Sequence, residues 1–390
     1  MRENSRNKII AGLIFIVILW FLFLCLLNYF AQKPRMDEGE VLRNIQELSI
    51  PQLFGELKYN QVFPRSYLAL ISFFSAHFSY SLLSLRLFPL LFMMAGFFLW
   101  VYIYKQEAKS NFYLFLLIFS FSSSMLMVDY AGYLKQYSCD VFAIAAFTLF
   151  IYYQKKYFNQ ETSIKCLWFF SIVTPVLIAF SQMSFFIFWI IIYNYLFLLR
   201  ENKKVLLPFA VYTFLAVLFC LLVYWFDIRH SMRIKFIQEY WNNSFIDTSS
   251  LYNFSKTFTN GLQNILVRWF IENKIAKSVA SVFMPFALIA IGKSFWVSLK
   301  DNKGKILDIS SICGVLIIEL FILGVFKIYP FTGSRITLFI APFIFFMIVQ
   351  GIYLVRKIKL IFVPLLSVYI IFLSGVSYHL LWFYLNFYKK

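Results

Sequence analysis

The sequence predicts an all-α polytopic membrane protein with about eleven transmembrane helices, and three observations lead to this fold class. The 390 residues are 61% hydrophobic and 22% aromatic, and the mean hydropathy is +0.74. Apolar runs of about 18 residues or more recur along the whole chain, and a helix of that length crosses the hydrocarbon core. The runs are continuous and lack a period of two, which excludes a transmembrane barrel as well as a water-soluble fold.

The first predicted span, 9–30, follows a basic N-terminal segment. At about 1.5 Å per residue it reaches about 33 Å, and no small-residue cleavage site follows it, so we expect a retained helix. The segment 66–79 is apolar but too short to cross, and we expect an interfacial or re-entrant helix there. The other predicted spans are 82–104, 111–128, 138–154, 164–180, 183–199, 205–226, 275–295, 306–326, 336–354 and 360–376.

Lysine and arginine gather in short clusters between the apolar runs, which is typical of cytoplasmic loops. This bias predicts a cytoplasmic N-terminus and puts four segments outside, namely 31–81, 129–140, 227–274 and 327–335. The net charge of +18 is explained by these loops and does not indicate nucleic-acid binding. Because no linker is visible, residues 1–390 are predicted to form one integral membrane domain, in which 31–81 is a first outer loop with juxtamembrane helices and 227–274 a large outer loop.

The stretch MDEGE, 36–40, places three carboxylates just after the first span. Asp37 and Glu40 have the spacing of a helix capping box. An apolar stripe follows at Val41, Leu42, Ile45 and Leu48. A short amphipathic helix over 38–48 is therefore predicted to lie on the outer membrane surface, and this structural interpretation accounts for the carboxylates by itself.

Charged residues also stand at the outer ends of several spans, where their placement costs free energy. Arg86 begins the second span, Lys135 and Asp140 begin the fourth, and Arg335 begins the tenth. Each has a structural explanation: Arg86 and Lys135 snorkel to headgroups, Arg335 anchors its helix, and Asp140 pairs with Lys135. Taken together on the side of Asp37, these cations indicate a site for an anionic substrate.

Five stretches in this order resemble the GT-C class of membrane glycosyltransferases, and within it the bacterial branch described as glycosyltransferase family 39, or protein O-mannosyltransferase-like. They are MDEGE (36–40), YNQVFPRSYLALISFF (59–74), SLRLFPLLFMMAG (84–96), YLKQYSCDVFAIAAF (133–147) and YPFTGSRITLFIAPF (329–343). The resemblance runs over most of the chain and implies a GT-C fold.

The resemblance implies an inverting transfer of a sugar from a polyprenyl-phosphate donor at the outer face of the cytoplasmic membrane. A prenyl phosphate leaves as an anion, so one carboxylate suffices, as a base for the acceptor. The resemblance assigns this role to Asp37, with Glu38 second. The candidates for binding the donor phosphate are Arg335, Lys135 and Arg86, together with Tyr137.

Further candidate contacts to the acceptor or the sugar are Tyr59, Asn60, Gln61, Arg65 and Asp140. Relatives usually carry a Pro-Pro pair where Pro64 and Arg65 stand, which leaves this part of the site open. No metal or other cofactor is predicted. Oligosaccharyltransferases of the same class use a divalent metal, for which Asp37, Glu38 and Asp140 would be the ligands here, but the mannosyltransferase-like branch does not imply one.

Two other functions stay open at this point. A transporter of lipid-linked sugars or polysaccharides also needs an outer cationic patch, although it needs no base and more often shows paired halves. An O-antigen polymerase or ligase would match the arginines of 227–274 but leaves the acidic pair unexplained. The predicted partners are the polyprenyl-phosphate donor, the bilayer and a glycan, lipid or protein acceptor, and no nucleic acid.

Overall fold

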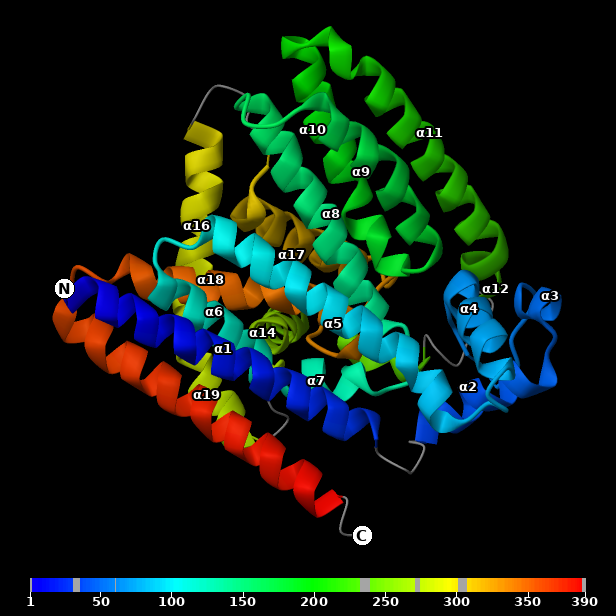
Figure 1. The fold of residues 1–390 in the computed structure, drawn as a ribbon, viewed down its shortest axis with the longest axis horizontal. Helices are drawn as coiled ribbons and strands as arrows, with labels where there is room; N and C mark the ends of the chain where they lie inside the picture. Colours follow the sequence, from blue (N-terminus) through cyan, green and yellow to red (C-terminus); the bar gives the residue numbers. More distant parts are fainter. Residues whose placement is uncertain are drawn as a thin grey trace.

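The computed structural model describes residues 2–30, 36–59, 61–231, 239–270, 274–300 and 307–387. Within these ranges the chain is helical and contains no strand. The helix α1 (Arg2–Tyr29) and the last helix, α19 (Lys359–Phe387), run side by side along one edge of the molecule, and α8 (Tyr137–Phe158) lies near its centre (Figure 1).

Seven of the described helices, some extended by a short turn of another helix type, are long and apolar enough to cross a membrane. They are α1, α5 (Leu82–Glu107), α10 (Phe188–Glu201) with η2 (Gln182–Phe186), α11 (Leu206–Val223) with η3 (Lys203–Val205) and η4 (Tyr224–Ile228), α16 (Met284–Lys300) with α15 (Lys274–Ser281), α18 (Ala341–Leu354) with η6 (Arg335–Ile340), and α19. These helices confirm the prediction of a polytopic all-α membrane protein.

The other four predicted spans also fall on helices. One is a pair, α6 (Asn111–Ser122) and α7 (Met125–Ala131), which bends by 59° and makes an eighth candidate span. Two are the shorter apolar helices α9 (Ile164–Val176), followed by the turn η1 (Leu177–Ala179), and α17 (Ile309–Val325). The fourth is α8. By length and composition, seven or eight of the described helices therefore qualify as spans, where about eleven were predicted.

Further helices lie in the predicted outer loops. The segment 66–79 contains α4 (Arg65–Ala76), whose 12 residues agree with the short helix expected there. The large loop contains α14 (Leu251–Val267), for which the sequence gave no prediction, between the short turns α12 (Arg229–Ser231) and η5 (Asn242–Ser244) and the helix α15. A Cβ on Gly333 would lie 1.9 Å from the carbonyl oxygen of Asn264 in α14, so only glycine lets the loop before η6 approach so closely.

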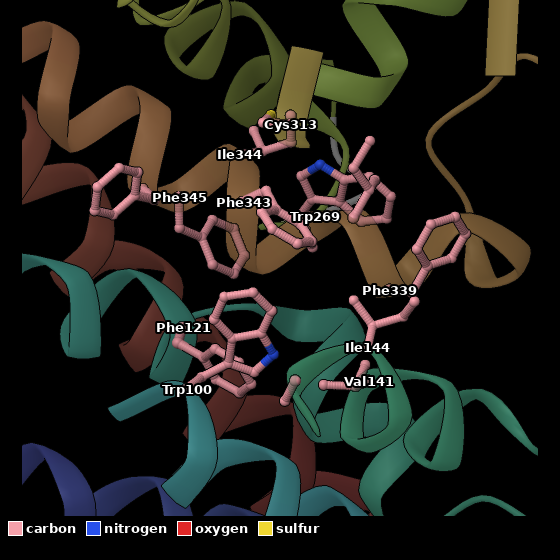
Figure 2. Packing of buried hydrophobic residues seen from close by; sticks show 14 of the residues in the cluster. Trp100, Phe121, Val141, Ile144, Trp269, Cys313, Phe339, Phe343, Ile344 and Phe345 are labelled. Atoms are coloured by element: carbon pink, nitrogen blue, oxygen red, sulfur yellow. The ribbon is translucent and has the colours of Figure 1, made fainter. Parts of the chain in front are cut away.

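The main hydrophobic core includes Val141 and Ile144 of α8 together with Trp100 and Phe343 (Figure 2). Trp100 of α5 is fully buried and meets the ring of Phe343 edge-on at 4.9 Å between centroids. A Cβ on Gly96 would lie 3.1 Å from the backbone of Phe142, so this glycine allows α5 and α8 to pack closely. Close packing of this kind holds helices together in lipid, where burial of apolar surface gives no drive of its own.

A second, smaller hydrophobic cluster joins α2 (Met36–Glu47), α3 (Ile50–Leu53) and α4, which gather at one end of the molecule where α5 begins (Figure 1). Val41 and Ile45, from the stripe predicted to face the membrane surface, are 1% exposed and pack in this cluster. The stripe therefore packs against the apolar face of α4 and not on the membrane surface. The helix also begins at Met36, so Asp37 lies in its first turn and is not the N-cap.

Candidate functional site

Most of the residues predicted to form the site lie together at the end of the molecule where α5 and α8 begin. Four contacts join them across the sequence: Glu38 to Arg86, Tyr67 to Lys135, Arg65 to Asp227 and Ser181 to Asp140. They bring α2, α4, α5, α8, the end of α11 and the link between η1 and η2 to one place. The prediction that these outer segments converge is therefore supported by the packing.

Glu38 and Arg86 form a buried ion pair in which both side chains are 1% exposed. Arg86 donates from Nη2 to Oε2 at 2.6 Å and from Nε to Oε1 at 3.0 Å. The same Oε1 accepts the backbone N–H of Leu134 at 2.9 Å. Glu38 therefore connects α2, α5 and the loop before α8, and this geometry favours a structural role for both residues over the catalytic and phosphate-binding roles assigned from the sequence.

Lys135 lies in that loop and is only 7% exposed. Its Nζ donates to Oε1 of Gln61 at 2.7 Å and lies 4.9 Å from the ring centre of Phe63. Its carbonyl oxygen accepts the hydroxyl of Tyr67 at 3.0 Å. The backbone and the ammonium of Lys135 are thus both held by residues of the first outer loop.

Gln61 is also bound to α2. Its Nε2 donates to Oε2 of Glu40 at 2.5 Å and to the carbonyl oxygen of Tyr59 at 3.2 Å. Glu40 was predicted to complete a capping box with Asp37. The structure instead places its carboxylate against Gln61, and the helix begins at Met36, two residues earlier than predicted.

Asp140 is 2% exposed in the first turn of α8, where its Oδ1 accepts the hydroxyl of Ser181 at 2.6 Å. Among the described residues its partner is this hydroxyl, so the predicted pairing of Asp140 with Lys135 is wrong. The carboxylate gains from the positive end of the α8 dipole.

Arg65 and Asp227 form a second buried pair, each 3% exposed. Asp227 lies in η4, a π-helical turn at the end of α11. Its Oδ1 accepts the backbone N–H of Arg65 at 3.2 Å, while Nε of Arg65 is 3.7 Å away and donates to the carbonyl oxygen of Phe226 at 3.3 Å. Nη1 of Arg65 has no hydrogen-bond partner although it is buried.

Other buried polar atoms near the beginning of α8 also lack partners, among them Oε1 of Gln136 and Oγ of Ser184. Gln136 precedes α8, and Ser184 belongs to η2, which packs against α8. Buried polar atoms are nearly always hydrogen-bonded in folded proteins. Polar atoms left without partners near Asp140 are suited to form hydrogen bonds with a ligand.

Arg335 is the first residue of η6, which packs against α8. The side chain of Arg335 is partly buried. Tyr137, in the first turn of α8, is 7% exposed and meets the ring of Tyr130 edge-on at 4.9 Å.

Tyr59 is exposed and its hydroxyl donates to Glu47 at 2.8 Å, so it faces the surface of the first outer loop. Asn60 lies outside the described residues, as does the side chain of Asp37.

Sequence analysis did not identify Asp227 or Ser181 as site residues. Asp227 directly follows the predicted span 205–226 on its outer end, and so it carries the same signal that drew attention to Arg86 and Arg335. Ser181 gives no such signal. The described residues contain no group of three histidine, cysteine, aspartate or glutamate side chains placed to hold a metal ion.

The fold is that of a polytopic GT-C membrane protein, as the resemblance implied. It is similar to the crystal structure of ArnT from Cupriavidus metallidurans bound to undecaprenyl phosphate, with a TM-score of 0.55 and 11% sequence identity. The similarity covers 98% of this chain and 76% of that one. No protein-family model matches the sequence, and a search of curated proteins finds no match.

Proposed function

We propose that this protein is an inverting glycosyltransferase of the family 39, or O-mannosyltransferase-like, branch, which moves a sugar from a polyprenyl-phosphate donor to a glycan, lipid or protein of the cell envelope. The observation that carries the proposal is the similarity in fold, over nearly the whole chain, to a protein crystallised with undecaprenyl phosphate. The convergence of Lys135, Asp140 and Arg335 at one end of the bundle supports it.

In the proposed reaction, the carboxylate of Asp37 takes the proton of the acceptor hydroxyl or amine. The freed lone pair attacks the anomeric carbon on the face opposite the phosphate. The carbon–oxygen bond to the phosphate breaks, and prenyl phosphate leaves with the electron pair. The position of Asp37 in the first turn of α2 supports this role, since α2 is fixed to α5 and the loop before α8 through Glu38.

The donor phosphate is bound by Lys135 and Arg335, with a hydrogen bond from Tyr137. Arg86 is left out, because its guanidinium already binds Glu38 in a two-point contact. Nη1 of Arg65 and Asp140 remain the candidate contacts to the sugar or acceptor. Gln61 is less suited because its amide already binds Lys135 and Glu40, and the exposed Tyr59 is the least suited. The proposed site faces the outside of the cytoplasmic membrane, with the N-terminus on the inner side.

The test of the base is Asp37→Asn, which keeps the size of the side chain and removes its charge. We expect transfer to fall by about 10²-fold or more, while expression and the thermal unfolding midpoint stay near those of the wild type. The measurement is mass spectrometry of envelope glycans and lipid-linked sugars in cells with the gene, without it and with the variant. Loss of one sugar together with accumulation of its prenyl-phosphate donor supports the proposal, and unchanged glycans in the deletion strain reject it.

A further inference from the structure

We infer that Gln61 and Glu40 form a positioning relay that holds the ammonium of Lys135 in place for the donor phosphate, an inference that rests on the function proposed above. The relay has two hydrogen bonds, from Nζ of Lys135 to Oε1 of Gln61 at 2.7 Å and from Nε2 of Gln61 to Oε2 of Glu40 at 2.5 Å. Through it, a residue of α2 acts on a cation that lies almost a hundred positions later in the sequence.

The chemistry of the three groups allows only one orientation of the Gln61 amide. An ammonium is purely a donor and an ionised carboxylate is purely an acceptor, while a primary amide has one end of each kind. The amide oxygen must therefore face Lys135 and the amide nitrogen must face Glu40. The second hydrogen on Nε2 is taken by the carbonyl oxygen of Tyr59 at 3.2 Å, which fixes the plane of the amide.

The backbone of Lys135 is anchored independently of this relay. Its carbonyl oxygen accepts from Tyr67 at 3.0 Å, and the N–H of the preceding Leu134 donates to Glu38 at 2.9 Å. The flexible part is the four-carbon side chain, which loses rotamer freedom whenever its ammonium binds a phosphate. A partner that restricts the side chain beforehand lowers that entropic cost at the moment of binding.

The relay therefore affects donor affinity more than the chemical step. The donor phosphate is charged both in the bound substrate and in the transition state, so a positioned cation stabilises both. Its loss raises KM and leaves kcat comparatively unchanged. A contact that only stabilised the fold would lower the unfolding midpoint without this split between KM and kcat.

The experiment measures binding of undecaprenyl phosphate to the purified full chain in lipid nanodiscs. We expect Gln61→Leu to raise Kd by about tenfold, and Glu40→Gln to raise it by about threefold, because a neutral amide still accepts from Gln61 but more weakly. The matched control is Glu47→Gln, on the same helix, since Glu47 is bound to Lys58 and Tyr59 at the surface. Its Kd should equal that of the wild type.

A double-mutant comparison tests whether Gln61 acts through Lys135. In the background of Lys135→Met, Gln61→Leu should give no further rise in Kd, because the group that it positions is gone. Additive effects of the two substitutions would overturn the relay, and so would a Kd for Gln61→Leu equal to that of the wild type. Failure of the wild type to bind undecaprenyl phosphate at all would instead reject the proposed function.

Discussion

The two buried ion pairs that the structure describes at the candidate site differ in how completely their charges are satisfied. Arg86 and Glu38 meet in a two-point contact at 2.6 and 3.0 Å, and a backbone N–H adds a third hydrogen bond to the carboxylate. Arg65 and Asp227 are also buried, yet Nε and Oδ1 are 3.7 Å apart and Nη1 of Arg65 has no partner.

This difference distinguishes two roles of a buried arginine, as a structural partner of a carboxylate and as a contact for a ligand. A buried charge with all its hydrogen bonds made within the protein has little left for a substrate, and removing its partner is costly. A buried guanidinium with an unused donor is already desolvated, and it gains a charge-assisted hydrogen bond when an acceptor oxygen arrives. The comparison favours a structural role for Glu38 and Arg86, and it supports the proposed contact of Arg65 with the acceptor or the sugar.

The largest predicted effect comes from breaking the Glu38–Arg86 pair. Arg86→Met leaves the carboxylate of Glu38 buried without its counter-charge, and we expect a loss of about 3–5 kcal/mol of stability. The measurement is unfolding of the purified protein in detergent, followed by circular dichroism.

The matched control replaces both partners, as Glu38→Leu with Arg86→Met. Because no charge is then left unpaired, this variant should recover most of the lost stability. If the double variant is as unstable as Arg86→Met alone, the two residues do not stabilise the fold chiefly by neutralising each other's charge.

A smaller effect on stability and a larger one on activity are expected at the second pair. Arg65→Met removes the long contact to Asp227 and the hydrogen bond to Phe226 but keeps the backbone N–H that Asp227 accepts. We therefore expect a loss of about 1.5–3 kcal/mol of stability. Transfer should fall more than this loss of folded protein explains, and KM for the acceptor should rise. Unchanged kinetic constants per folded molecule would show that Arg65 has a structural role and no contact with the acceptor or the sugar.

The sequence predicted the helical membrane fold because apolar runs mark the membrane-spanning helices and basic clusters mark the loops between them. It also predicted which segments converge, since Arg86, Lys135, Asp140 and Arg335 all stand at predicted outer span ends. It did not predict the pairing among them. Whether Glu38 meets Arg86 or a substrate depends on how α2 packs on α4 and α5, and the apolar stripe of α2 is equally compatible with protein and with lipid.

The smallest expected effect belongs to the exposed pair of Glu47 and Lys58. This pair is a solvent-exposed reference for the stability that the two buried pairs contribute. Hydrogen bonds from Lys58 and then Tyr59 lower the pKa of Glu47 from its usual value, because they stabilise the ionised form. A lowered pKa in the folded state contributes stability above the pKa of the unfolded chain, about 4.3, and this contribution is lost as the pH falls through the folded-state value. Glu47→Gln should therefore lower the unfolding midpoint slightly at pH 6, and the difference should vanish at a lower pH, below the folded-state pKa, where the carboxyl is protonated in either state. An effect that persists at the lower pH would mean that the side chain of Glu47 acts through packing, and would remove this pair as the solvent-screened reference.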